Sequence, residues 1–158
     1  MNHCVNATSC PANTYGDPIN GLCAAHCPSP NGNQMFADTN PNVKMCVYIC
    51  PEGYYIQNIS NNWTCVTTCL ANYYIDYVTD TCVGTCPHGS FSHTNGQCLN
   101  ECPSPSFFAN PLTYQCDAAC TSNYFADPTT QTCVPVCPHG YFGDTNGYTC
   151  VQTCTVAT

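Results

Sequence analysis

The spacing of the cysteines constrains this chain more than any other feature of its sequence. Eighteen of the 158 residues are cysteine, and sixteen of these form Cys-x3-Cys pairs. A cysteine share above about 8–10% in a short chain is typical of a disulfide scaffold, and disulfides persist in oxidising compartments. We therefore expect an extracellular protein, secreted or on the cell surface, that is stabilised by disulfides.

The Cys-x3-Cys pairs recur with a period of mostly 16 to 19 residues. A looser pair, Cys4/Cys10, precedes them. Self-similarity at a short period indicates a repeat architecture. The pairs are Cys23/Cys27, Cys46/Cys50, Cys65/Cys69, Cys82/Cys86, Cys98/Cys102, Cys116/Cys120, Cys133/Cys137 and Cys150/Cys154. We predict one array of repeats 4–22, 23–45, 46–64, 65–81, 82–97, 98–115, 116–132 and 133–149, with a terminal half-repeat 150–158.

An aromatic residue lies five positions after the second cysteine in seven of the eight loops between the pairs, and the long loop after Cys27 delays it to Phe36. A turn sequence and a returning segment such as Thr-Cys-Val follow the aromatic residue. This order predicts a short hairpin in each repeat. A lone hairpin is marginal in water, so we expect the aromatics to stack each repeat on the next. They are Tyr15, Phe36, Tyr55, Tyr74, Phe91, Phe107, Phe125 and Phe142. The predicted fold is small and disulfide-rich: an elongated rod of tandem β-hairpins with little regular secondary structure and no helix.

An aspartate often follows the aromatic residue by two positions. The examples are Asp17, Asp38, Asp76, Asp127 and Asp144. A short acidic side chain that accepts hydrogen bonds from its own turn explains this position. Calcium would require six or more oxygens that converge on one point. We interpret the aspartates as turn residues and predict no metal or other cofactor.

Two disulfide pairing schemes fit the spacing. In the first, the second cysteine of each pair bonds the first cysteine of the next pair. In the second, pairs interlock, as Cys46 to Cys65 with Cys50 to Cys69. We favour the first scheme because it closes every hairpin in the same way. It predicts Cys10–Cys23, Cys27–Cys46, Cys50–Cys65, Cys69–Cys82, Cys86–Cys98, Cys102–Cys116, Cys120–Cys133 and Cys137–Cys150.

The first scheme leaves Cys4 and Cys154 without partners. Spare cysteines at the two ends of an array are placed to bond copies head to tail, and a contact of this kind that does not close into a ring generates a filament. The alternative is that Cys4 and Cys154 pair with parts of a longer chain. Both interpretations stay open at this stage.

The charge balance excludes several functions. The chain has one basic residue, Lys44, against nine acidic residues, and its formal net charge is −8. Phosphate-backbone binding, which depends on Lys and Arg, is therefore not expected. A thiolate metal-buffering protein is a weaker alternative, because zinc knuckles use tight Cys-x2-Cys spacing, which this chain lacks.

Three sequons predict N-glycosylation at Asn6, Asn58 and Asn62, and the last two lie in one loop. Thr129, Thr130 and Thr145 are further candidates for O-linked sugar. Covalent glycans would supply the solubility that the few charged residues do not supply.

Nothing in the sequence predicts an enzyme. There is no Gly-rich phosphate loop, and the carboxylates occupy repeat-equivalent turns instead of one cleft. His88 and His139 both occur in Cys-Pro-His-Gly, which favours a shared turn role. Trp63 lies within a sequon and does not indicate a sugar-binding cleft.

The sequence contains no run of about 18 apolar residues, so no membrane span is expected. Its first residues lack the basic and apolar regions of a signal peptide. Because a disulfide-bonded protein needs an export signal, we expect this chain to be a mature or excised segment.

The unit Cys-Val-x-x-Cys-Pro-x-Gly-Tyr-Phe-x-Asp, with its turn and Thr-Cys-Val, resembles the furin-like or growth-factor-receptor type of cysteine-rich repeat. It is especially similar to the long arrays on surface proteins of ciliated protists. The motifs CPEGYY, CPHGSF and CPHGYF carry the resemblance, with joints at Cys46, Cys65, Cys82, Cys133 and Cys150. The resemblance implies a rod-like ectodomain without catalysis. The joints depart from the commoner two-residue spacing, so the family's disulfide connectivity is not carried over.

These observations favour a structural function. We expect an extracellular glycoprotein that forms a rod-like subunit or segment of a fibril or surface coat and binds copies of itself end to end. The alternative is a receptor or adhesion ectodomain with a protein or glycan partner. The irregular stretch from Cys27 to Cys65, with its long loops and paired sequons, is the candidate region for such a partner.

Overall fold

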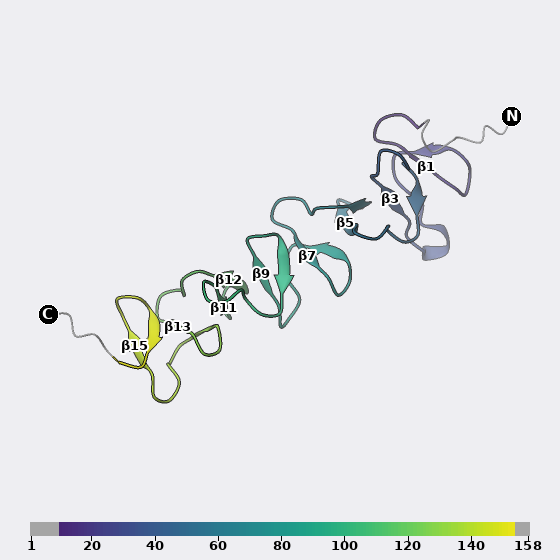
Figure 1. Cartoon of the computed structure of the whole chain (residues 1–158). Helices are drawn as coiled ribbons and strands as arrows, with labels where there is room; N and C mark the ends of the chain where they lie inside the picture. The colour runs from purple at the N-terminus through teal and green to yellow at the C-terminus, as the bar shows by residue number, and fades with distance from the viewer. Residues whose placement is uncertain (1–9, 154–158) are drawn as a thin grey trace. The chain divides into compact units, whose positions relative to one another are not determined.

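The computed structural model describes residues 10–153 of the chain. Over these residues the chain forms eight antiparallel hairpins in succession. Figure 1 labels the first strand of each hairpin along the chain. The described part contains no α-helix, and its one 3-10 turn, Pro30–Gly32, lies in the long loop after Cys27. The prediction of a disulfide-rich, helix-free fold of tandem hairpins is confirmed.

Each hairpin consists of an outgoing strand and a returning strand that contains a cysteine. The pairs are β1 (Tyr15–Gly16) with β2 (Cys23–Ala24), β3 (Phe36–Asp38) with β4 (Cys46–Val47), β5 (Tyr55–Ile59) with β6 (Asn62–Val66), β7 (Tyr74–Asp76) with β8 (Thr81–Val83), β9 (Phe91–His93) with β10 (Gln97–Leu99), β11 (Phe108–Asn110) with β12 (Gln115–Asp117), β13 (Phe125–Asp127) with β14 (Thr132–Val134), and β15 (Phe142–Asp144) with β16 (Thr149–Val151).

An aromatic residue begins every outgoing strand. The register of β13 and β14 is typical: Phe125 pairs with Val134 and Ala126 pairs with Cys133. In the sixth hairpin the residue at this position is Phe108, which pairs with Asp117, and not Phe107 as five-residue counting predicts. The loop from Cys102 contains one extra residue before the strand, and this insertion displaces the count by one.

The third residue of most outgoing strands closes the turn. Asp38 Oδ1 accepts a hydrogen bond from the N–H of Asn40 at 2.9 Å, and the same bond to the residue two positions on occurs at Asp17, Asp76, Asn110, Asp127 and Asp144, at 2.8–3.0 Å. The aspartates therefore act as turn residues, as the sequence predicts, because a short carboxylate can accept a hydrogen bond from the backbone N–H two residues further on. Asn110 makes the same bond without a charge.

The joints between hairpins also share one geometry. The N–H of Tyr54 donates to the carbonyl of Pro51 at 3.0 Å, and Gly53 between them has φ 80°. His88 and His139 occupy the second position of two equivalent turns, in which Gly89 and Gly140 have positive φ. Only Gly, and less often Asn, adopts this conformation without strain, which explains Pro-x-Gly after the cysteines.

Successive hairpins are linked by parallel pairing. The outgoing strand of one hairpin lies beside the returning strand of the next, for example with Ala126 beside Thr149 and Ala109 beside Thr132. The described residues fall into two compact units that divide between Gly84 and Thr85. In the first unit, β3 to β8 form a mixed sheet in the order β7-β8-β5-β6-β3-β4; in the second, the order is β15-β16-β13-β14-β11-β12-β9-β10.

One main-chain hydrogen bond accompanies this pairing at five joints. The N–H of Ala126 donates to the carbonyl of Tyr148 in the next hairpin at 2.7 Å. Equivalent bonds join Gly16 to Lys44, Ile56 to Asp80, Ser92 to Tyr114 and Ala109 to Gln131, at 2.8–2.9 Å. All five acceptor residues are left-handed, with φ of 44–55°. That conformation directs the acceptor carbonyl toward the preceding hairpin.

The core is small because each hairpin contributes only a few side chains to it. It is made largely of returning-strand cysteines and small residues of the outgoing strands, such as Cys65, Ala37 and Ala126, which are at most 2% exposed. So little apolar surface cannot offset the conformational entropy of the chain. Each disulfide closes a loop of 12 to 19 residues and therefore stabilises the folded state by roughly 3 kcal/mol.

The left-handed acceptor generates a first prediction. Gln131 has φ 53°, so Gln131→Val should lower the free energy of unfolding by about 1–2 kcal/mol, because a β-branched residue is strained there. Gln131→Gly is the matched control, since it also removes the Gln131 side chain and should keep wild-type stability or exceed it. Urea denaturation with intact disulfides measures both; equal stability of the two variants would contradict the geometry.

Candidate binding and assembly surface

Residues 10–153 contain eight disulfides, and they follow the first pairing scheme. Each joins the cysteine before an outgoing strand to the cysteine of the returning strand, and the Cα atoms are 5.4–5.6 Å apart. Every hairpin is thus closed at its base. Eight disulfides indicate an oxidising compartment.

Aromatic contacts join neighbouring hairpins, but they do not stack equivalent rings. Phe125 lies against Tyr148, which is the left-handed acceptor of the next hairpin, with ring centroids 6.5 Å apart. Tyr55 contacts Tyr77 at 5.8 Å and Phe36 contacts Trp63 at 6.0 Å, both edge to face. These three outgoing-strand aromatics therefore each cover the turn or the returning strand of the next hairpin. Phe107 likewise contacts a neighbour, His93, at 4.7 Å.

Asp127 shows the electrostatics of the turns. Its burial raises the pKa of the carboxyl, but hydrogen bonds from the side chain and backbone of Thr129, and then from Thr130, outweigh burial and hold the pKa below its ordinary value of 3.8. The N–H of Thr129 donates at 2.9 Å and the hydroxyl of Thr130 at 2.8 Å. These two predicted O-linked acceptors thus have their hydroxyls engaged with a carboxylate.

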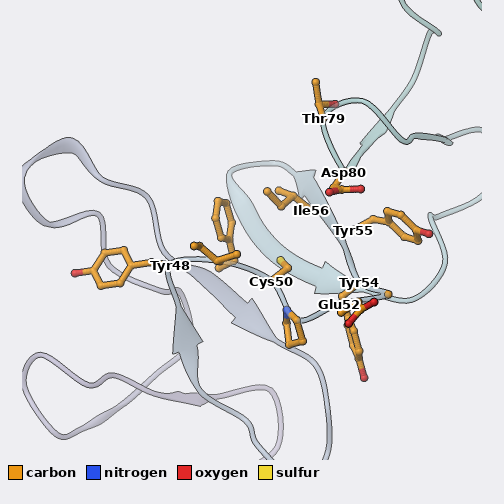
Figure 2. A pocket seen from close by; sticks show the side chains of 12 residues that line it. Tyr48, Cys50, Glu52, Tyr54, Tyr55, Ile56, Thr79 and Asp80 are labelled. Carbon is orange, nitrogen blue, oxygen red and sulfur yellow. The ribbon is translucent and has the colours of Figure 1, made fainter.

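A groove of about 390 Å³ lies in the first unit, where three successive hairpins meet. Phe36, the joint from Tyr48 to Gly53, the start of β5 and the turn residues Thr79 and Asp80 line it. Figure 2 shows Glu52 beside Tyr54 on one side of it, with Asp80 near Ile56. The groove therefore combines apolar and aromatic side chains with two carboxylates.

The most exposed apolar residue of this groove is Ile49, at 83%, and Tyr48 is 52% exposed. Partial burial raises the pKa of Tyr55 above its ordinary value of 10.0, and the neighbouring Tyr77 and then Asp80 add to the shift. The Tyr55 phenol therefore stays neutral at physiological pH. A neutral hydroxyl on an aromatic ring can both donate and accept hydrogen bonds.

A second groove, of about 350 Å³, occupies the same place in the repeat within the second unit. Phe91, Cys102, Ala109 and Gln131 stand where the first groove has Phe36, Cys50, Ile56 and Asp80. At the joint, however, Asn100 and Glu101 replace Tyr48 and Ile49. The groove thus results from the geometry of the repeat, while the side chains at its joint are apolar in the first unit and polar in the second.

The two described sequons flank the turn of the longest hairpin. Asn58 pairs with Trp63 and Ile59 pairs with Asn62, so Asn58 and Asn62 are directed to opposite faces of the β5–β6 hairpin. Ser60 and Asn61 form the two-residue turn with φ of 51° and 63°. The Asn58 Oδ1 atom is buried without a hydrogen-bond partner.

Three residues singled out from the sequence, Cys4, Asn6 and Cys154, lie outside the described residues. Between residues 10 and 153, no three His, Cys, Asp or Glu side chains are grouped so that they could hold a metal ion. In the same part of the chain, no helix is long and apolar enough to cross a membrane.

The sequence did not reveal the left-handed acceptors or the groove. The acceptors share a backbone conformation but no chemistry, since they include Lys44, Asp80 and Gln131. The groove is formed by residues of three successive hairpins, from Phe36 to Asp80, so no local motif marks it. The one sequence signal was the irregular stretch from Cys27 to Cys65, where most of the groove residues lie.

The hairpins and their disulfides define a class: the chain is a tandem disulfide-bonded β-hairpin repeat protein, with eight disulfides at a spacing of about 17 residues. No protein-family model, curated protein or solved structure matches it. The resemblance to furin-like repeats therefore stays a prediction.

A second prediction concerns pH. Because the folded pKa of Asp127 is depressed, its contribution to stability is present above the unfolded value and is lost as the pH falls through the lower folded value, below 3.8. Asp127→Asn keeps the Oδ1 acceptor, as Asn110 shows, but removes the titration. Unfolding measured from pH 7 to pH 2 should thus show a shallower acid loss in the variant. Parallel profiles would contradict the assignment.

Proposed function

We propose that this chain is an extracellular structural glycoprotein, a rod-like subunit or segment of a fibril or surface coat whose copies join end to end. The observation that carries the proposal is the repeated joint: the same main-chain hydrogen bond links successive hairpins at five places. A joint made by backbone atoms propagates with little dependence on side chains. Stability in such arrays is a sum of repeat and nearest-neighbour terms.

Other features support a structural role. The disulfides close each module separately, so the array does not depend on one central core. The resemblance to cysteine-rich repeats of ciliate surface proteins is consistent with a surface location. Glycans at Asn58 and Asn62, on opposite faces of one hairpin, would give a neutral polar surface. The proposed role requires neither catalysis nor a cofactor, nucleic acid or membrane span.

The decisive experiment is electron microscopy of the chain produced in a secretory host, with non-reducing and reducing gels of the same material. We expect filaments with a regular subunit repeat, and bands larger than a monomer under non-reducing conditions where Cys4 and Cys154 link copies. Isolated particles at all concentrations, with a single monomer band, would overturn the proposal.

The groove favours a second candidate function, an adhesion or receptor ectodomain with a protein or glycan partner. Exposed Ile49 and the aromatic rings of Tyr54 and Tyr55 offer apolar contact, while Glu52 and Asp80 accept hydrogen bonds. Ligand sites typically combine an apolar lining with a few polar groups.

This second candidate predicts a ligand that depends on the groove. Glycan and peptide arrays probed with the native chain should give binders that are lost in Ile49→Ser, with the matched Val136→Ser variant unaffected. Val136 is the equivalent joint residue in the second unit and is 77% exposed. Equal loss in both variants would point away from the groove.

A further inference from the structure

The outgoing strand of the last described hairpin has an edge without a partner among residues 10–153. In β13, Ala126 pairs with Cys133 of its own hairpin and donates its N–H away from it, to Tyr148. In β15, Gly143 pairs with Cys150 in the same register. The N–H of Gly143 therefore points away from β16, to the side on which other outgoing strands receive the next hairpin.

The side chains of β15 are uncovered on the same side. Phe142 is 56% exposed, whereas the first-strand aromatics of the other seven hairpins are all at least half-buried. Gly143 is exposed, whereas its equivalent Ala126 is 2% exposed. In this strand the surface that other hairpins bury against the next hairpin is therefore exposed.

The first hairpin carries the complementary group. In the second hairpin, the carbonyl of Met45 accepts from Asp38 of its own hairpin and the carbonyl of Lys44 accepts from the preceding hairpin. In the first hairpin, the carbonyl of Leu22 likewise accepts from Asp17. Gly21 therefore stands in the place of Lys44. It is left-handed, with φ 69°, and its carbonyl has no partner among residues 10–153.

We propose that the β15 edge of one copy binds the first hairpin of a second copy, with the Gly143 N–H donating to the Gly21 carbonyl and β15 lying parallel to β2. This inference rests on the proposed end-to-end assembly and names its interface. The occupant is a second copy because the contact continues the joint already present five times within the chain.

The side chains fit the same geometry. Tyr55 contacts Tyr77, which follows the turn aspartate Asp76, and in the first hairpin Pro18 takes the place of Tyr77 after Asp17. Phe142 of one copy would therefore cover Pro18 of the other, both of which are exposed in the single chain. The contact is heterologous, since different surfaces of the two copies meet, so repeated use builds a chain of subunits.

The interface is small, with one strand of three residues, so association should be weak and dependent on concentration. Sedimentation velocity over a dilution series measures it. The starting protein is the full chain with Cys4→Ser and Cys154→Ser, which leaves only non-covalent association. We expect oligomers that lengthen with concentration.

Gly143→Pro removes the outward N–H donor and should weaken association about tenfold. A Cβ at Gly143 would lie 2.7 Å from the Phe125 ring, so that ring must shift to admit the proline. Phe142→Ser is a second variant that removes the apolar contact and keeps the N–H, and it should weaken association as well. Val136→Ser is the matched control, since Val136 is exposed but lies outside the β15 edge. Circular dichroism and disulfide mapping check that each variant folds.

The outcomes separate this interface from the proposed function. If the double-serine protein stays monomeric at every concentration while the wild-type chain forms filaments, the β15 interface is overturned and end-to-end assembly survives. Association that is unchanged in both Gly143→Pro and Phe142→Ser also overturns the interface. If neither the wild-type chain nor the double-serine protein associates, the proposed function fails with it.

Discussion

The hydrogen bond from an outgoing strand to a left-handed residue of the next hairpin is the interaction on which the rest of the structure depends. It joins backbone to backbone, so it repeats although the acceptors differ as widely as Lys44 and Tyr148. The conformation costs about 1–2 kcal/mol for a residue other than glycine. A hydrogen bond and a parallel strand contact at each joint offset that cost.

Stability is organised locally in consequence. Each hairpin is too small to remain folded alone, because its buried residues are mainly one cysteine and one small residue, as with Cys133 and Ala126. The disulfide reduces the entropy of the unfolded loop, and the neighbouring hairpin covers the remaining apolar surface. Side chains outside these two requirements are free to vary. The two grooves show this freedom, since the joint has Ile49 in one and Glu101 in the other.

Local hydrogen bonds within each turn explain how a chain with almost no basic residues buries carboxylates. Asp38 and Asp127 are each 1% exposed, yet their negative charges need no cationic partner. A backbone N–H group of the turn donates to each carboxylate instead. Threonine hydroxyls also donate to Asp127, and these hydrogen bonds lower its pKa. Asn110 performs the same structural task without a charge, which shows that the acceptor oxygen is what the turn requires.

The sequence by itself determined the features that depend on neighbours along the chain. Cysteine spacing and recurring turn residues predicted one hairpin per repeat and the absence of helix, because loop closure and turn formation are local events. Counting residues misplaced one strand, since an insertion after Cys102 moved the strand aromatic to Phe108. Only the tertiary structure decided which backbone groups meet between hairpins and where grooves form. The left-handed conformation of Gln131 and Tyr148 cannot be recognised from their residue types. The edge at Gly143 was identified only by comparing it with the five joints in which the equivalent N–H donates to the next hairpin.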